Sequence, residues 1–196
     1  MIRRDYIVRM IEEFIRALAR IHAAKKGRRW QEADHAIDEE LQRLIGTVAK
    51  TVSGLSETEL LARLMQGEST HAVHDKTLIL TTLLNEAGDA AAEQGQTEES
   101  QACYLKGLHL LLHALECDDV SECPEFVPKI EVFVMALRDT PLPVRTHGLL
   151  MQHYERTGEF AKAEDALFSM LEADPDNAGI VEFGLTFYAR VLAQSD

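Results

Sequence analysis

The distribution of proline is the feature of the sequence that most restricts the fold. All five prolines lie between residues 124 and 175, so the first 123 residues contain none. Because proline interrupts helices, that stretch is able to form long ones. Its apolar residues recur at spacings of three and four, while strand-like alternation of β-branched residues is nearly absent. In segment 2–26 this spacing predicts one helical stripe, formed by Ile7, Ile11, Phe14, Leu18 and Ile21. We therefore predict an all-α protein.

Glycines divide the predicted helices into antiparallel hairpins. We expect hairpins over about 2–46, 73–117 and 141–173, turning at Gly27, Gly95 and Gly158, and a C-terminal helix over about 176–193. Gly27 is predicted to be a left-handed helix stop. Between the hairpins, Ser56 and Glu59 have the spacing of a capping box, residues 66–75 are expected to form a loop, and another helix is expected near 126–138. Thr140 and Asp174 are predicted to cap the helices that follow them. At 196 residues the chain is expected to form a single domain, 1–196.

The third predicted hairpin resembles a tetratricopeptide (TPR) repeat. Six positions agree with that repeat: Leu150, Tyr154, Gly158, Phe160, Ala163 and Pro175. Met151 and Leu167 depart from it, where the repeat has a small residue and an aromatic. The second hairpin keeps Leu84, Gly88, Gly95 and Tyr104, whereas in the first Trp30 and Ala33 stand one residue late relative to Gly27. The glycines are 68 and 63 residues apart rather than about 34, so the resemblance implies a TPR-like right-handed array with extra inserted helices.

The N-terminal stretch DYIVRMIEEF also carries a resemblance. It is similar to the opening, D-Y-I-x-R-M-I-x-x-F, of a family of uncharacterised bacterial helical proteins. That resemblance implies a bacterial, cytoplasmic, TPR-like protein and no particular reaction.

The formal net charge of −13 is divided unevenly along the chain. Residues 1–30 contain nine Lys or Arg and three Asp or Glu, a net charge of +6, which leaves −19 for residues 31–196. The acidic part would repel a phosphate backbone, so nucleic acid is an unfavourable partner. A basic head and an acidic body also favour head-to-body association between copies, and we expect a homo-oligomer.

The basic head supports an alternative function. Arg3 and Arg4 precede the apolar stripe of segment 2–26, and Arg28 and Arg29 follow it, so this helix is a candidate contact for nucleic acid or a membrane surface. The interpretation that we prefer is that the stripe is the core face of the first hairpin. No apolar run reaches the roughly 18 residues of a membrane span, the N-terminus lacks the apolar stretch of a secretory signal, and the three cysteines form no CxxC pair. We therefore expect a cytoplasmic protein that is not integral to a membrane.

The TPR resemblance implies a peptide-binding groove lined by the first helix of each hairpin. Carried over by position, the candidate groove residues are Asn85 and Asp89 in the second hairpin and Arg145 and Gln152 in the third. A clamp for a terminal carboxylate needs Lys, Arg and Asn, and only Asn85 and Arg145 suit it. Because acidic residues surround them, a basic or apolar helical ligand is favoured over an acidic tail.

Metal and catalytic sites have weaker signals. His109, His113 and Cys117 recur at intervals of four, and Cys123 lies just beyond, which is a spacing that zinc ligands on one helix can use. On so apolar a helix, histidines more often pack or cap, and we prefer that interpretation. The chain has no GxSxG, GxxxxGK[ST] or GxGxxG motif. We expect no cofactor and no catalytic residues.

The combined expectation is a non-enzymatic protein-interaction or scaffold module that self-associates and whose partner is a protein or peptide. The alternatives are an adaptor or regulator that uses the basic N-terminal helix on nucleic acid or membrane, and a metal-binding helical protein.

Overall fold

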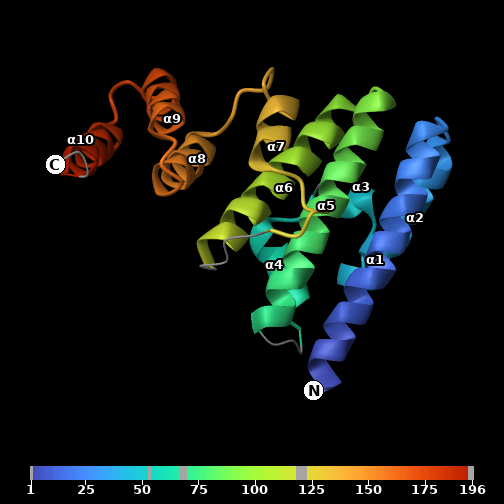
Figure 1. Ribbon diagram of the computed structural model, residues 1–196. Coiled ribbons are helices and arrows are strands. Elements are labelled where there is room, and N and C mark those ends of the chain that lie inside the picture. Colours follow the sequence, from blue (N-terminus) through green and yellow to red (C-terminus); the bar gives the residue numbers. More distant parts are fainter. Residues whose placement is uncertain (1, 53, 67–69, 118–122, 194–196) are drawn as a thin grey trace. The chain divides into compact units, whose positions relative to one another are not determined.

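A computed structural model describes residues 2–52, 54–66, 70–117 and 123–193 (Figure 1). These residues form ten helices and no strand, which confirms the all-α prediction. Their contacts divide the chain into two compact units, unit 1 over Met1–Thr140 and unit 2 over Pro141–Asp196, whereas the sequence alone suggested one domain.

Unit 1 contains seven described helices. They are α1 (Ile2–Lys26), α2 (Trp30–Ile45), α3 (Ala49–Val52), α4 (Glu57–Met65), α5 (Thr70–Glu93), α6 (Thr97–Cys117) and α7 (Ile130–Ala136). α1 packs on α2, α5 on α6, and α7 on α6.

The capping box at the start of α4 is confirmed: the Ser56 backbone donates to the Glu59 carboxylate at 2.8 Å, and the Glu59 backbone donates to Oγ of Ser56 at 3.2 Å. The predicted 66–75 loop is too long, because α5 already begins at Thr70.

α5 lies at the centre of unit 1. Every residue from 77 to 88 is buried, because α1, α2, α4 and α6 all pack against this helix. The segment 123–129 crosses over it in Figure 1, where the carbonyl of Phe126 accepts a hydrogen bond from Thr82 and the Phe126 ring meets Phe14 edge-on at 5.3 Å. Phe14 belongs to the predicted stripe of α1. That stripe is therefore part of the core of unit 1.

The three helix pairs share one turn geometry. In each turn a backbone N–H bonds to the carbonyl five residues earlier, from Arg29 to Ala24, from Gln96 to Ala91 and from Glu159 to Tyr154. This bond requires a left-handed residue just before the donor. Gly95 and Gly158 have φ of 75° and 77°, but the first turn uses Arg28, with φ 54°.

The prediction that Gly27 is the left-handed stop is therefore wrong. Gly27 still belongs to the final helical turn, and its N–H bonds to the carbonyl of Ala23. Counting from Arg28 instead removes the one-residue offset of the first hairpin: Trp30 then matches Phe160, and Ala33 matches Ala163. Both alanines are fully buried, as close approach of two helices requires.

Unit 2 consists of α8 (Val144–Arg156), α9 (Phe160–Ala173) and α10 (Ala178–Ala193). α9 packs on both α8 and α10. Two predicted caps are wrong. α8 starts four residues after Thr140, and Asp174 ends α9, since its N–H bonds to the carbonyl of Met170. The side chain of Asn177 accepts from the N–H of Gly179 at 3.0 Å, so Asn177 caps α10.

Helix-interior glycines explain how closely α5, α6 and α7 approach. A Cβ added to Gly88 would lie 2.8 Å from the ring of Tyr104, and one added to Gly107 would lie 2.6 Å from the ring of Phe133. Tyr104 and Phe133 meet edge-on with centroids 6.5 Å apart, so neither ring moves without disturbing the other. Gly148 in α8 differs, because its added Cβ would meet only the end of Met170 at 3.8 Å.

We expect Gly88→Ala to lower the free energy of unfolding by about 1–3 kcal/mol through overpacking. Gly148→Ala serves as the control, because it relieves the poor helix propensity of glycine without a clash and should be neutral or stabilising by up to about 1 kcal/mol. Urea unfolding followed by circular dichroism measures both. Equal stability of the two variants would contradict the close packing of Tyr104 on Gly88.

Candidate functional site

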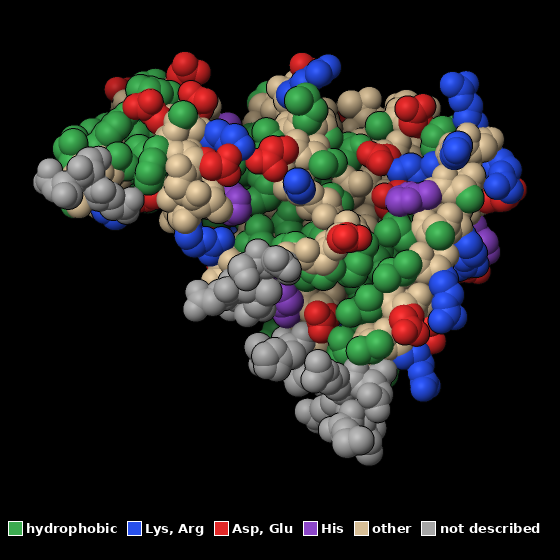
Figure 2. All heavy atoms as spheres, viewed as in Figure 1, with side chains coloured by type: hydrophobic (Ala, Val, Ile, Leu, Met, Phe, Trp, Pro, Cys, Tyr) green, Lys and Arg blue, Asp and Glu red, His purple; other side chains and the backbone are tan. Residues whose placement is uncertain are grey.

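An exposed apolar stripe runs along α10. Val181, Leu185, Tyr188 and Leu192 follow one another at spacings of four, three and four, which places them on one side of the helix. Leu185 and Leu192 are 67% and 69% exposed. Phe168 of α9 is also half-exposed. We call these five residues the α10 face, and Figure 2 shows hydrophobic side chains gathered over α10.

The opposite side of α10 holds this face in place. Ile180, Gly184 and Phe187 are buried, again at helical spacing. An added Cβ at Gly184 would lie 3.0 Å from Leu167, so the missing side chain lets α10 approach α9 closely. Because both sides of α10 are apolar, the helix as a whole has the character of a buried helix although one side is open.

Two polar links complete the attachment of α10. The Tyr188 hydroxyl donates to the carboxylate of Glu164 on α9. Arg190 donates to both oxygens of the Glu155 carboxylate on α8, at 2.5 and 2.8 Å. The charge of Arg190 is thereby balanced inside unit 2. Glu182 of α10 and Glu164, which accepts from Tyr188, remain as acidic groups beside the α10 face.

A partly buried charge network joins α1 to α5 and α6 in unit 1. Lys25 donates to Glu86 and to Asp89, both at 2.6 Å, and the Tyr104 hydroxyl donates to Asp89 at 2.5 Å. His22 lies 3.0 Å from the other oxygen of Glu86. Burial lowers the pKa of Lys25, but the hydrogen bonds to the two carboxylates outweigh that effect and raise it. Burial, with the hydrogen bond to Asp89, raises the pKa of Tyr104. The raised pKa values keep Lys25 charged and Tyr104 neutral at neutral pH, which suits a structural role.

The predicted groove residues do not occupy equivalent positions. Asn85 is buried in α5, and its Oδ1 has no partner among the described residues. Asp89 is bound by Lys25 and Tyr104. Arg145 and Gln152 are exposed on α8 in unit 2. Asn85 therefore does not line an open groove, and Asp89 is committed to the charge network.

The candidate metal ligands named from the sequence also do not come together. His109 is buried, with its Nδ1 2.8 Å from the carboxylate of Glu57, so it fastens α6 to the start of α4. His113 and Cys123 are exposed, and the side chain of Cys117 lies outside the described residues. Among the residues that the structure describes, no three His, Cys, Asp or Glu side chains come together as metal ligands. Burial raises the pKa of the Cys103 thiol to about 12, so that thiol is protonated at neutral pH.

The basic candidates lie around α1. Arg28 and Arg29 are exposed in the first turn, where Arg29 donates to Glu32 at 2.6 Å. The side chains of Arg3 and Arg4 lie outside the described residues. The middle of the stripe between them is buried at Phe14, Leu18 and Ile21. No helix in the described part of the chain is both long enough and apolar enough to cross a bilayer.

The charge network generates a prediction with a matched control on the same helix. Lys25→Met leaves the buried Glu86 carboxylate without its ammonium partner, and we expect it to lower the free energy of unfolding by about 3 kcal/mol. Lys26→Met removes the same charge from an exposed position and should change stability by less than about 0.5 kcal/mol.

The pH dependence of stability follows from the direction in which the pKa of Lys25 is shifted. Because the pKa of Lys25 is raised above 10.5, its contribution is fully present below pH 10.5 and is lost as the pH rises through the folded-state value. The stability difference between wild type and Lys25→Met should therefore be constant from pH 7 to 10 and shrink above that. Chemical unfolding at several pH values measures it, and equal stability of the Lys25 and Lys26 variants would refute the network.

Comparison with known proteins places the chain in a family. A family model described as a family of unknown function (DUF6483) matches residues 1–196. Neither the curated proteins nor the solved structures gave a match. The chain therefore belongs to the DUF6483 family, whose function is unknown.

Proposed function

We propose that this protein is a non-enzymatic interaction module that self-associates through the α10 face. The observation that supports the proposal is the run of Val181, Leu185, Tyr188 and Leu192 along one exposed side of α10. A stripe with alternating spacings of three and four is the pattern by which one helix packs along another. These four side chains, with Phe168 on the neighbouring α9, expose a large apolar surface, and exposed apolar surfaces mark interaction sites.

The order of helices in unit 2 supports the same proposal. α9 packs on α8 and α10 packs on α9, so each helix covers the apolar side of the one before it. The outer side of α10 is likewise apolar. A further helix laid against α10 would extend the packing already present between α9 and α10.

For a second copy of this chain as the occupant, charge restricts where the two copies can meet. Each copy carries a net charge of −13, so two copies repel one another over most of their surfaces. α10 contains one acidic and one basic residue, Glu182 and Arg190, and Arg190 is balanced by Glu155. The four stripe residues themselves are uncharged, so contact through them places apolar side chains rather than charges against each other. Two stripes packed about a two-fold axis also bury each other completely.

The test is the oligomeric state of the full chain, measured by light scattering coupled to gel filtration. We expect a dimer that persists at 1 M NaCl, because apolar burial is not weakened by salt. Leu185→Glu should give a monomer of unchanged helix content. Thr186→Glu introduces the same charge at the next position, also exposed but outside the stripe, and should remain dimeric.

Two outcomes would overturn the proposal. One is a wild-type monomer at all concentrations up to about 100 μM, since specific contacts of ordinary size hold at that concentration. The other is a dimer that dissociates with salt and is unaffected by Leu185→Glu. That result would assign the association to attraction between the basic head and the acidic body instead.

A further inference from the structure

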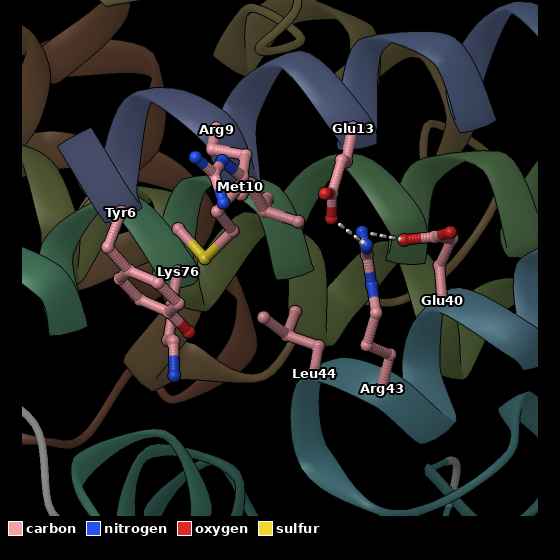
Figure 3. Close-up of a pocket in the computed structure, with 9 residues that line it drawn as sticks. Tyr6, Arg9, Met10, Glu13, Glu40, Arg43, Leu44 and Lys76 are labelled. Atoms are coloured by element: carbon pink, nitrogen blue, oxygen red, sulfur yellow. Dashed lines mark hydrogen bonds and ion pairs between the residues drawn. The ribbon is translucent and has the colours of Figure 1, made fainter.

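A cavity lies in unit 1 where α1, α2 and α5 meet (Figure 3). Its volume is about 340 Å³, at the lower end of the range for small-molecule sites. Met10 of α1, Leu44 of α2 and Ile79 of α5 form its apolar wall. Ile79 belongs to the hydrophobic core of unit 1, and Met10 and Leu44 pack against that core, so the fold holds the wall in place. The cavity is separate from the α10 face, which belongs to unit 2.

The side chains of the wall suit a flat ring. Figure 3 shows Met10 and Leu44 extending from α1 and α2 into the space between these helices. The thioether of methionine makes favourable contacts with aromatic rings and adapts to their shape. Tyr6, which is half-exposed, lines the same cavity and supplies a ring for edge-to-face packing. The wall therefore favours an aromatic group.

The carboxylates that line the cavity already have cationic partners. Arg43 donates to Glu13 at 2.8 Å and to Glu40 at 2.5 Å, and Figure 3 shows its guanidinium between the two carboxylates. Glu40 has a second partner, because a guanidinium nitrogen of Arg20 lies 4.0 Å from its other oxygen. Two arginines thus accompany these two carboxylates, and a cationic ligand would have to compete with them.

The remaining basic residues of the lining do not form an anion site. Figure 3 shows the cationic groups of Arg9 and Lys76 pointing in different directions. Arg9 is exposed to water, and Lys76 has an interaction partner of its own. A charged ligand would lose hydration on entering the cavity, and a lining group would have to leave water or its present partner to compensate. The charges therefore favour an uncharged ligand.

We propose that this cavity binds an uncharged aromatic molecule of one or two fused rings, a size suited to its small volume. The rings lie on Met10, Leu44 and Ile79, and the ring of Tyr6 packs against their edge. Burial of apolar surface supplies the affinity. Because no ion pair forms between ligand and protein, salt does not weaken the binding.

The test uses 2-naphthol as the probe, titrated calorimetrically into the full-length protein at neutral pH. We expect one 2-naphthol per chain, with an affinity that 1 M NaCl does not reduce. Two analogues carry a charge on the same ring system, 2-naphthoate a negative one and 2-naphthylmethylammonium a positive one. Both should bind at least about tenfold more weakly, because a charge gains no free partner in the cavity.

Substitutions in the wall locate the probe. Met10→Trp fills the cavity and should weaken binding of 2-naphthol at least about tenfold. Met65→Trp is the matched control, because Met65 is an exposed methionine of α4 outside the lining, and it should bind like wild type. Tyr6→Ala removes a half-exposed ring and leaves the apolar wall intact, so it tests the site even if Met10→Trp disturbs the fold. It should weaken binding by about two- to tenfold.

Three results would overturn the proposal. They are absence of 2-naphthol binding to wild type, binding unchanged by Tyr6→Ala and Met10→Trp, and equal binding of either charged analogue. The α10 face is another apolar surface that the probe can reach, so the Leu185→Glu chain is titrated as well. It should bind 2-naphthol like wild type, whatever the outcome of the self-association test. Loss of binding in that chain would place the probe on the α10 face and would also overturn the proposal.

Discussion

Burial of α5 on all sides is the constraint on which unit 1 depends. A helix surrounded by protein cannot expose its polar side chains to water, and α5 carries several of them. Thr77 and Thr82 donate to carbonyls one turn earlier in the same helix. Glu86 has no such local solution, and Lys25 of α1 together with His22 supplies its partners. The position of α1 along α5 is therefore specified by charge as well as by packing.

That constraint determines which surfaces remain available for function. α1 contributes Phe14 and Ile21 to the core and Lys25 to the network, so its apolar stripe is already used within unit 1. Of the large apolar side chains that are exposed in the described part of the chain, five belong to the α10 face. The other six lie on α1, α4 and α7 in unit 1, so the proposed apolar contact rests on the way the five are grouped on two neighbouring helices and not on their number.

The fold class followed from local chemistry, because helical periodicity and capping depend on residues close in sequence. The turn at Arg28 could not be predicted from local chemistry. A left-handed arginine costs about 1–2 kcal/mol, and packing of the surrounding helix pair has to offset that cost. Asn85 was assigned to a groove by position, but the helices around α5 bury it. α10 is apolar on both sides, so its sequence does not reveal which side is open. The cavity combines Met10, Leu44 and Ile79, which are far apart in sequence, and only the packing of three helices brings them together.

The proposed self-association also has to end at two copies, and the presence of a single α10 face on each copy explains why it would. A head-to-tail contact would leave one α10 face open at the end of every assembly, and a further copy would add there without limit. Packing of α10 against α10 about a two-fold axis covers both faces at once. The −13 charge on each copy then opposes any additional contact between the acidic surfaces that remain. An apolar stripe of this kind on a strongly acidic chain therefore favours a closed pair over an open array.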